Sequence, residues 1–454
     1  MKQYNFGLII LFILQIIFLM SFSFTLWPEM LSFPYFVNNG LVLYKDLVFV
    51  YTPLSILPQI LFFKIGFVNP FFLKLFFIFY KLITLLVFIK VFEVINLKKD
   101  LKVILYGLFL VILMFEFVPN SFWPDSILSL YLIIFIFYYI RSRFFLAGLF
   151  LGLCFLTKQT SIIFFPPSLL LVLIYERNLK ILLNYILGFV VPVTIFILYL
   201  VTSNTVGDFY RWAIYYPLYF WREIPGYLYL LNSKREMIFM FIVNFPIFLI
   251  VLKRNLRNKI SLSLVIFSLL SLFLMFPRYT PIHLSSNLII SVLLWRIVLN
   301  KFTAGKQILI LILIILMGYF IIKPSFKFSN SIRFFENSDL KISNTLNEVI
   351  LKSDNVYLLG LHSGLYFSAN LLPPTPWLDN YPWYFEIQNE SMNTLNKWNS
   401  DKNPEYIIKT NDTNKSYYDI DGYRSVLFSA YLNSFYEVNR IDNLNLEIWK
   451  RIKN

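Results

Sequence analysis

Long apolar runs separated by short polar connections fill residues 1–323. Eleven of these runs are long enough, or nearly so, to cross a hydrocarbon layer of about 30 Å at about 1.5 Å per helical residue. They lie at residues 5–26, 71–95, 102–118, 125–140, 143–157, 159–175, 181–202, 237–252, 260–276, 283–299 and 306–323. The first run has no small-residue cleavage site, so we interpret it as a retained anchor. The pattern predicts a polytopic α-helical membrane protein with about eleven transmembrane helices.

The pattern changes in residues 324–454, where Asn, Asp, Ser and Pro become common and apolar residues occur only in short runs. Buried strands are predicted at 355–361 and 405–410, and a closing strand pair at 436–439 and 445–452. Helical periodicity covers 331–351 and 387–399. We therefore divide the chain into a transmembrane part, 1–323, and a small C-terminal α/β domain, 324–454.

Basic residues in alternate connections give the orientation. Five connections of the same parity carry Lys98, Lys99 and Lys102; Arg141 and Arg143; Arg177 and Lys180; Lys253, Arg254, Arg257 and Lys259; Lys301 and Lys306. By the positive-inside rule these connections face the cytoplasm. The N-terminus is then cytoplasmic and the C-terminal domain extracytoplasmic.

The composition supports this class of protein. The 454 residues are 58% hydrophobic and only 14% charged, whereas soluble domains carry about a quarter charged residues. The net charge of +15 divides into +17 for residues 1–323 (27 basic, 10 acidic) and −2 for residues 324–454 (13 basic, 15 acidic). The basic excess therefore fits topology signals and lipid head groups rather than nucleic acid. A single cysteine, Cys154, excludes an intramolecular disulfide framework.

The first outer loop, residues 27–70, is too long for a simple connection and too apolar to float in water. Amphipathic stretches interrupted by prolines predict helices that lie in the membrane interface. Glu29 and Asp46 would lie near the membrane surface, where a partly desolvated carboxylate can accept a proton from an acceptor hydroxyl. The alternative is a solvated loop acid or a helix cap.

A second acidic position opens the run at 125–140 on the same face. Asp125 ends the segment NSFWPD, and both Asp125 and Glu29 complete a Trp-Pro-acid triplet. Two acids on one face can cooperate, one as a base and one to orient the acceptor or hold a divalent cation. A structural cap, with Pro124 in the first helical turn, is the alternative.

Lys158 lies between two apolar runs that are each short for a membrane crossing. An ammonium group held at a recessed junction is costly, so a functional role is expected, and a phosphate is its natural partner. Gly148 and Gly152 are spaced to permit close helix approach. A lysine that extends to the interface from a tight helical hairpin is the alternative.

Basic and aromatic residues also occur in two later outer loops. Arg278 and His283 lie in the segment PRYTPIH, and Arg222 lies among many Tyr and Trp residues in loop 203–235. Arg278 can clamp a phosphate and His283 can supply a proton or hydrogen bond. Anchoring of the helices at the interface by an aromatic belt is the alternative. No nucleotide-binding loop or metalloprotease motif is present in the sequence.

The order of these features resembles the GT-C superfamily of polytopic glycosyltransferases, in particular the bacterial branch with aminoarabinose transferases and protein O-mannosyltransferase relatives. The resemblance rests on an acid after the first span, a G-x-x-L-Y-x-D and Pro-Leu loop, the WPD opening and a G-L-x-x-L-T-K-Q segment. These correspond to Glu29; Gly40, Leu43, Tyr44, Asp46, Pro53 and Leu54; Asp125; and Gly152, Leu153, Leu156, Thr157, Lys158 and Gln159.

The resemblance implies transfer of a sugar from a polyprenyl-phosphate donor to a lipid, glycan or protein acceptor on the outer face of the bacterial cytoplasmic membrane. The implied catalytic residues are Glu29, Asp46 and Asp125. The implied donor-phosphate residues are Lys158, Gln159, Arg278 and His283, with Tyr44 and Arg222 as substrate-binding residues. No cofactor is assigned, and a divalent cation is a candidate. Many relatives have Asp where this chain has Glu29, so either Glu29 or Asp46 can be the base.

Other functions fit parts of the pattern. A polyprenyl-linked glycan polymerase or ligase is an enzymatic alternative. A transporter or flippase of lipid-linked sugars would need charged residues at mid-membrane and discontinuous helices in paired halves. The charges here instead gather at the outer rim, and the halves do not match. We therefore expect a glycosyltransferase.

Overall fold

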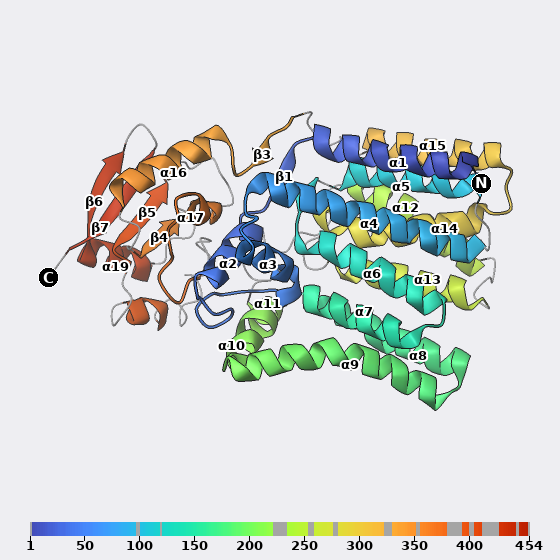
Figure 1. Cartoon of the computed structure of the whole chain (residues 1–454), viewed down its shortest axis with the longest axis horizontal. Helices are drawn as coiled ribbons and strands as arrows, with labels where there is room; N and C mark the ends of the chain where they lie inside the picture. Colours follow the sequence, from blue (N-terminus) through green and yellow to red (C-terminus); the bar gives the residue numbers. More distant parts are fainter. Residues whose placement is uncertain are drawn as a thin grey trace.

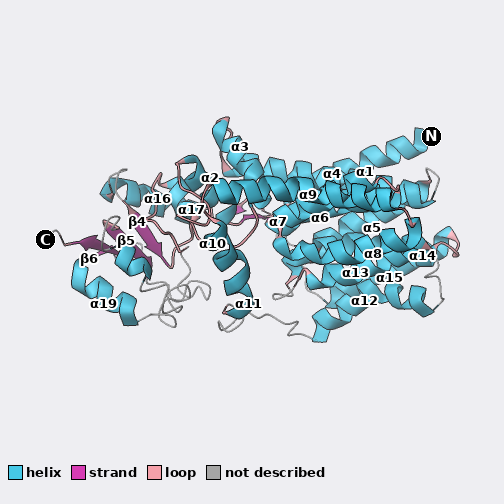
Figure 2. Cartoon of the chain, turned by 90° about the horizontal axis from the view of Figure 1, so that it is seen from below, coloured by secondary structure: helices cyan, strands magenta, loops and turns pink. Residues whose placement is uncertain are grey.

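A computed structural model describes residues 2–96, 100–118, 120–220, 234–252, 258–275, 280–321, 329–350, 355–378, 393–398, 404–410, 426–441 and 445–452. The described chain is elongated, with a bundle of long helices at one end and a smaller domain of strands and helices at the other (Figure 1). The same separation is visible in the perpendicular view (Figure 2). The N-terminus lies at the far end of the bundle and the C-terminus at the far end of the smaller domain.

A helix forms at every predicted apolar run. The bundle contains α1 (Lys2–Ser21), α4 (Pro70–Asn96), α5 (Leu101–Phe117), α6 (Pro124–Ile140), α7 (Phe144–Thr157), η2 (Gln159–Phe164) with α8 (Phe165–Glu176), α9 (Leu179–Thr202), α12 (Lys234–Leu252), α13 (Lys259–Phe273), α14 (Ser285–Leu299) and α15 (Ala304–Ile321). Among the described residues, four segments are long and apolar enough to cross a membrane: Gln3–Ser21, Pro70–Ile95, Gln159–Glu176 and Leu179–Thr202. Crossing by all eleven runs, and the sidedness of the loops, stay predictions.

The first helix is shorter than predicted. The run expected at 5–26 ends as a helix at Ser21, and Phe24–Leu26 instead forms strand β1. This strand pairs in parallel with β2 (Ser121–Phe122) on one side and β3 (Ile332–Arg333) on the other. The alternating Phe-Thr-Leu pattern buries Phe24 and Leu26 completely, so pairing with two distant segments replaces the last helical turn.

Glycines bring α7 and α9 together, as the spacing of Gly148 and Gly152 predicted. A Cβ atom on Gly148 would lie 2.1 Å from the backbone oxygen of Tyr185 on α9. A Cβ atom on Gly188 of α9 would lie 2.1 Å from the backbone oxygen of Phe145. Both helices therefore contact each other backbone to backbone, which only glycine allows.

The segment at residues 27–70, predicted to be the first outer loop, folds into α2 (Glu29–Asn38), η1 (Pro53–Ser55) and α3 (Leu57–Lys64). Residues 29–36 of α2 are all buried, so protein covers every face of this helix. Large apolar side chains are exposed on α3 and directly after it: Leu57, Leu61, Ile65 and Phe67. The interfacial location predicted for these helices stays a prediction. Loop 203–235 is described as far as residue 220 and contains α10 (Val206–Phe209), η3 (Tyr210–Tyr215) and α11 (Tyr216–Tyr219).

The C-terminal part contains a four-stranded sheet in the order β4-β5-β7-β6. The strands are β4 (Val356–Leu359), β5 (Tyr406–Thr410), β6 (Tyr436–Ile441) and β7 (Leu446–Arg451), and the helices are α16 (Asn337–Val349), α17 (Gly364–Ser368) and α19 (Val426–Phe435). The predicted strands and closing strand pair are confirmed. The helix predicted at 331–351 begins only at Asn337, after β3, where Glu336 and Asp339 form a capping box. The helix predicted at 387–399 is described only at 393–398, which is helical.

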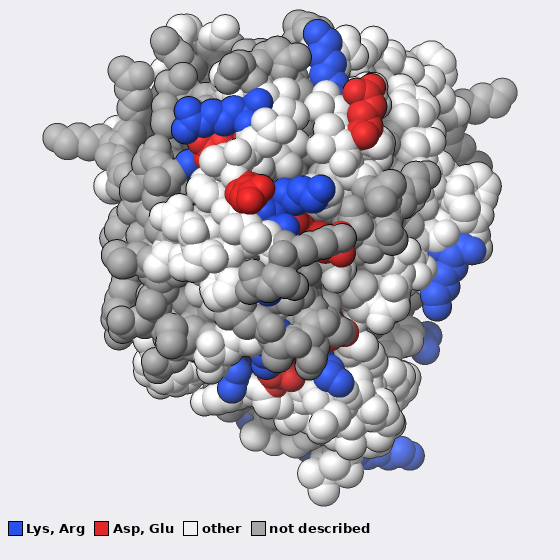
Figure 3. Space-filling model, turned by 90° about the vertical axis from the view of Figure 1, so that its left-hand side faces the viewer, with Lys and Arg blue, Asp and Glu red and all other residues white. Residues whose placement is uncertain are grey.

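Aromatic packing joins the C-terminal part to α2. Trp377 is fully buried, and its ring centroid lies 5.2 Å from that of Phe33 and 4.9 Å from that of Phe36. Ser32 of α2 also donates a hydrogen bond to Ser363 at 2.9 Å. On the side of the molecule that the C-terminal part occupies, basic and acidic side chains are interspersed (Figure 3). These contacts hold α2 in place against the C-terminal part.

Candidate active site

The two Trp-Pro-acid triplets meet because the strands before them pair in parallel. Leu26 of β1 lies opposite Phe122 of β2, and each strand runs directly into its triplet. The indole rings of Trp27 and Trp123 contact each other at 5.4 Å between centroids. Each triplet then begins a helix, with Glu29 as the first residue of α2 and Asp125 in the first turn of α6. Both acids therefore follow the carboxyl ends of neighbouring parallel strands, where ligands bind in many sheets.

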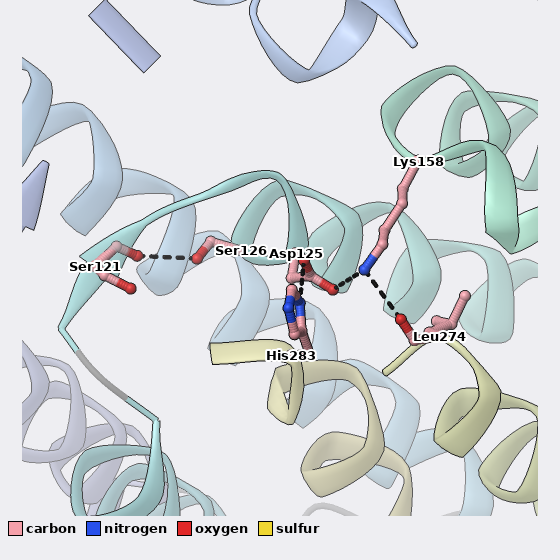
Figure 4. Close-up of polar contacts among 6 residues, drawn as sticks. All are labelled: Ser121, Asp125, Ser126, Lys158, Leu274 and His283. Atoms are coloured by element: carbon pink, nitrogen blue, oxygen red, sulfur yellow. Dashed lines mark hydrogen bonds and ion pairs between the residues drawn. The ribbon is translucent and has the colours of Figure 1, made fainter. Parts of the chain in front are cut away.

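Asp125 is the centre of a buried ionic cluster (Figure 4). Its Oδ1 atom lies 2.9 Å from the Nζ atom of Lys158, and its Oδ2 atom lies 2.8 Å from the Nδ1 atom of His283. The side chains of Asp125 and Lys158 are only 2% and 8% exposed. A carboxylate only accepts hydrogen bonds, so the Nδ1 atom of His283 carries the proton. The cluster joins α6, the end of α7 and η6 (Pro281–His283), which precedes α14.

Lys158 lies at a break between two helices. It is the residue after α7, and its backbone is extended, with φ −151° and ψ 113°. Its ammonium group also donates to the backbone oxygen of Leu274 at 3.0 Å, just after α13. The predicted junction between two short helices is therefore confirmed. Both of its described contacts are protein groups, which gives Lys158 a structural partner that the sequence did not reveal.

Glu29 is buried, with 7% of its surface exposed. Pro28 precedes it in helical conformation, which suits a first helical turn, and no side-chain cap is formed there. The next polar residue on the same helix, Ser32, hydrogen bonds to the C-terminal part. Glu29 therefore begins the helix that contacts the C-terminal part.

Solved structures with the same arrangement identify the fold. ArnT from Cupriavidus metallidurans in the apo state matches with a TM-score of 0.57 and 12% identity, over 99% of this chain and 98% of that one. The same protein bound to undecaprenyl phosphate matches with a TM-score of 0.59 and 12% identity, over 100% and 98%. The archaeal oligosaccharyltransferase AglB from Archaeoglobus fulgidus, in complex with an inhibitory peptide and a dolichol-phosphate, matches with 0.57 and 9%, over 99% and 74%. The chain has the GT-C fold.

Sequence comparison alone does not reach this result. No family model matches the chain, and no curated protein matches it. The GT-C fold is nevertheless consistent with the residue order that suggested it, from the acid after the first span to the segment around Lys158.

Three other candidate residues, Tyr44, Asp46 and Gln159, form hydrogen bonds with the backbone. The Oδ2 atom of Asp46 accepts from the amide of Val42 at 2.9 Å, which closes a local turn. Burial raises the pKa of the Tyr44 phenol, which keeps its proton and donates to the backbone oxygen of Tyr51 at 2.8 Å. The side-chain amide of Gln159 donates to two backbone oxygens, those of Val50 and Ala213, each at 2.8 Å. The structure thus shows a packing role for each of them.

Two predicted basic residues, Arg222 and Arg278, lie outside the described residues. The donor set does not favour a divalent cation at Asp125, because both carboxylate oxygens already contact basic side chains. Within the described ranges, no group of three or more His, Cys, Asp or Glu residues is placed to hold a metal. We therefore derive no step through a metal ion.

One basic residue that sequence reasoning missed is Lys81 on α4. It is 9% exposed, and its ammonium lies 5.4 Å from the ring centroid of Phe77. The sequence feature that could have indicated Lys81 is its position in the middle of an apolar run, because a charged group is costly in a membrane. The same run also contains Lys74, which is buried, and Lys90, which is exposed, so the sequence could not show which of the three lysines are buried.

Proposed function

We propose that this GT-C chain is a membrane glycosyltransferase that transfers a sugar from a polyprenyl-phosphate donor to a lipid, glycan or protein acceptor on the outer face of the cytoplasmic membrane. The observation that carries the proposal is the parallel pairing of β1 and β2, which sets Glu29 and Asp125 at one end of a sheet. The fold is shared with an ArnT bound to undecaprenyl phosphate and an AglB bound to dolichol-phosphate. Both ligands are lipid phosphates.

In the proposed reaction the acceptor oxygen attacks the anomeric carbon of the sugar while the bond to the donor phosphate oxygen breaks. The lipid phosphate leaves with the electron pair of that bond. The acceptor proton passes to a carboxylate, for which we assign Glu29. The carboxylate of Asp46 is engaged within its own loop, where it accepts a hydrogen bond from the amide of Val42.

The ionic cluster has a different role in this proposal. A carboxylate between an ammonium and an imidazole is a weaker base than an isolated one, because both partners favour its charged form. Asp125 therefore positions Lys158 and His283 rather than accepting the proton. His283, held through its Nδ1 atom, is then oriented toward the departing phosphate, whose growing charge basic groups stabilise.

The test uses a deletion strain complemented with variants, since the sugar is unidentified. Lipid-linked sugars are profiled by mass spectrometry in strains that carry the wild type, Glu29→Gln or Asp46→Asn. We expect one polyprenyl-phosphate sugar to accumulate in the deletion strain and with Glu29→Gln, because loss of a general base costs about 10²–10⁴ in rate. Asp46→Asn serves as the matched control and should restore the wild-type profile.

Full complementation by Glu29→Gln, at equal protein level, would contradict the assignment of the base. A flippase would give a different result: the accumulated sugar lipid would stay protected from a glycosidase added outside spheroplasts. Accumulation on the outer face, accessible to the added enzyme, supports transfer as the missing step.

A further inference from the structure

An open cleft lies between the start of α4 and the C-terminal part. It has a volume of about 1010 Å³ accessible to solvent, at the upper end of the range of about 300–1,000 Å³ found for small-molecule sites. Its walls come from the first residues of α4, from β3 and the first turn of α16, and from the end of α17. Strand β3 lies between the bundle and α16 (Figure 1), so the cleft lies where the two parts of the molecule meet.

Strand β3 connects this cleft to the first Trp-Pro-acid triplet. Ile332 lines the cleft and belongs to the strand that pairs with β1, which runs into the triplet. Two residues later, the ring of Phe334 contacts that of Trp27 at 5.8 Å between centroids. Phe335 then lines the cleft again. The cleft and Glu29 are therefore attached to the same short sheet.

Amides, hydroxyls and ring faces line the cleft. Apart from one acid, its polar side chains are Asn69, Asn330, Ser331, Asn337, Ser338 and Ser368. Side-chain amides and hydroxyls both donate and accept hydrogen bonds. Apolar ring faces come from three phenylalanines: Phe71, Phe335 and Phe367. A saccharide has the complementary surface, because its hydroxyls donate and accept hydrogen bonds while the C–H groups of its ring pack on aromatic faces.

Two of these polar groups are held in place by the backbone. The Oδ1 atom of Asn69 accepts from the amide of Phe72 at 2.7 Å, so the amino group of this side chain is the part that can donate. The hydroxyl of Ser368 donates to the backbone oxygen of Gly364 at 3.2 Å, so its oxygen can accept. A ligand that binds these groups does not have to order them first, which favours binding.

The charge of the cleft disfavours an anionic occupant. Among the described residues that line it, Glu336 is the only ionisable one. The start of α16 would attract an anion, but two of its amides are already taken by the capping box of Glu336 and Asp339. In this box the amide of Glu336 donates to Asp339 at 3.0 Å. A phosphorylated head group would therefore approach a carboxylate, and like charges repel.

The strand that borders the cleft is closed to an extended peptide. Peptides often bind by adding a strand to a free sheet edge, and β1 occupies one edge of β3. On β3, the backbone oxygen of Ile332 accepts from the amide of Phe335 at 3.1 Å. The amide of Ser331 donates to the hydroxyl of Ser329 at 3.0 Å. These backbone groups are satisfied within the chain, which favours a saccharide over a protein segment.

We propose that this cleft binds the acceptor as an uncharged oligosaccharide, with sugar rings on Phe71 and Phe367 and sugar hydroxyls on the surrounding amides and hydroxyls. The proposal deepens the proposed function and rests on it for the role of the saccharide as acceptor. Of the acceptor classes that the proposed function leaves open, it selects a glycan, either free or carried by a lipid.

Photo-cross-linking in living cells tests the occupant of the cleft in the full chain. Phe71→p-benzoylphenylalanine introduces a photoreactive group into the wall, and the adduct formed on irradiation is digested and analysed by mass spectrometry. We expect an adduct of hexose or N-acetylhexosamine units, and a lipid tail on it would distinguish a lipid-linked glycan from a free one. Phe79→p-benzoylphenylalanine is the matched control, because Phe79 is 57% exposed on the same helix and does not line the cleft. The glycan adduct should be at least tenfold more abundant at position 71.

A second substitution narrows the cleft in the cross-linking chain. Asn337→Trp places a large ring in the wall and should lower the yield of glycan adduct at least tenfold. Asn347→Trp is its control, since Asn347 is exposed on the same helix, α16, and does not line the cleft. The yield with Asn347→Trp should equal that of the chain without it. If Asn337→Trp fails to fold, Ser338→Phe takes its place.

A peptide or a phospholipid as the main adduct at position 71 would overturn the proposal. Equal glycan yield at positions 71 and 79, or a yield that the narrowed cleft leaves unchanged, would overturn it as well. Failure of the proposed function gives a different result. A glycan adduct at position 71, with no lipid-linked sugar accumulating in the deletion strain, would refute sugar transfer alone. Accumulation of that sugar with a peptide adduct would refute the saccharide cleft alone.

Discussion

Removing both members of the Asp125–Lys158 pair should cost less stability than the two single removals added together. The two side chains are almost fully buried and their charged atoms are 2.9 Å apart. Breaking a buried pair costs about 3–5 kcal/mol because it leaves a charge without compensation. Lys158→Met leaves Asp125 with His283, so we expect a loss of about 3 kcal/mol. Asp125→Asn leaves two basic groups without an acid, so we expect a loss closer to about 5 kcal/mol.

The double variant Asp125→Asn/Lys158→Met contains neither charge of the pair. Its loss of stability should be smaller than the sum of the single losses by about 2 kcal/mol or more, because neighbouring groups in one network do not act additively. Equilibrium unfolding in mixed detergent–SDS micelles, followed by tryptophan fluorescence, measures all four free energies. Losses that add within about 0.5 kcal/mol would refute the reasoning.

Activity separates the structural role of the pair from its place in the site. The double variant should lose less stability than the two single variants together and still transfer little sugar, because His283 has only a neutral amide oxygen in place of the carboxylate that orients it. A double variant with wild-type turnover would show that the pair serves folding only.

Two further predictions concern packing. Gly148→Ala should destabilise the chain by about 1–3 kcal/mol, because its Cβ meets backbone of α9, whereas Gly305→Ala, with open space around it, should be close to neutral in the same unfolding assay. Trp377→Ala should cost about 3–5 kcal/mol and make the C-terminal part more sensitive to limited proteolysis, because the buried ring of Trp377 packs on α2. Leu340→Ala, at an exposed position, is the control. Equal sensitivity of the two variants to proteolysis would contradict the packing argument.

The sequence predicted those parts of the fold that depend on local patterns. Each apolar run became a helix, and the strands at 355–361 and 405–410 were recognisable because short apolar runs were bounded by polar residues. The close approach at Gly148 followed from spacing alone. The end of the first helix was missed because β1 exists only through pairing with two strands that are distant in sequence.

The types of residue in the site could be predicted from the sequence, but most of the contacts between these residues could not. The Trp-Pro-acid triplets were visible at 27–29 and 123–125, yet strands of two or three residues carry no periodicity that shows they pair. Lys158 was predicted to bind phosphate because an ammonium in an apolar run needs an anion. The sequence cannot distinguish an anion of the substrate from the carboxylate of Asp125, which lies 33 positions earlier in the chain.

The ionic cluster limits what can bind at Lys158. Asp125, Lys158 and His283 satisfy one another, so a substrate phosphate at Lys158 would have to displace the Asp125 carboxylate and leave it buried beside a second anion. That exchange is unfavourable in a site with little water, since like charges repel more strongly there.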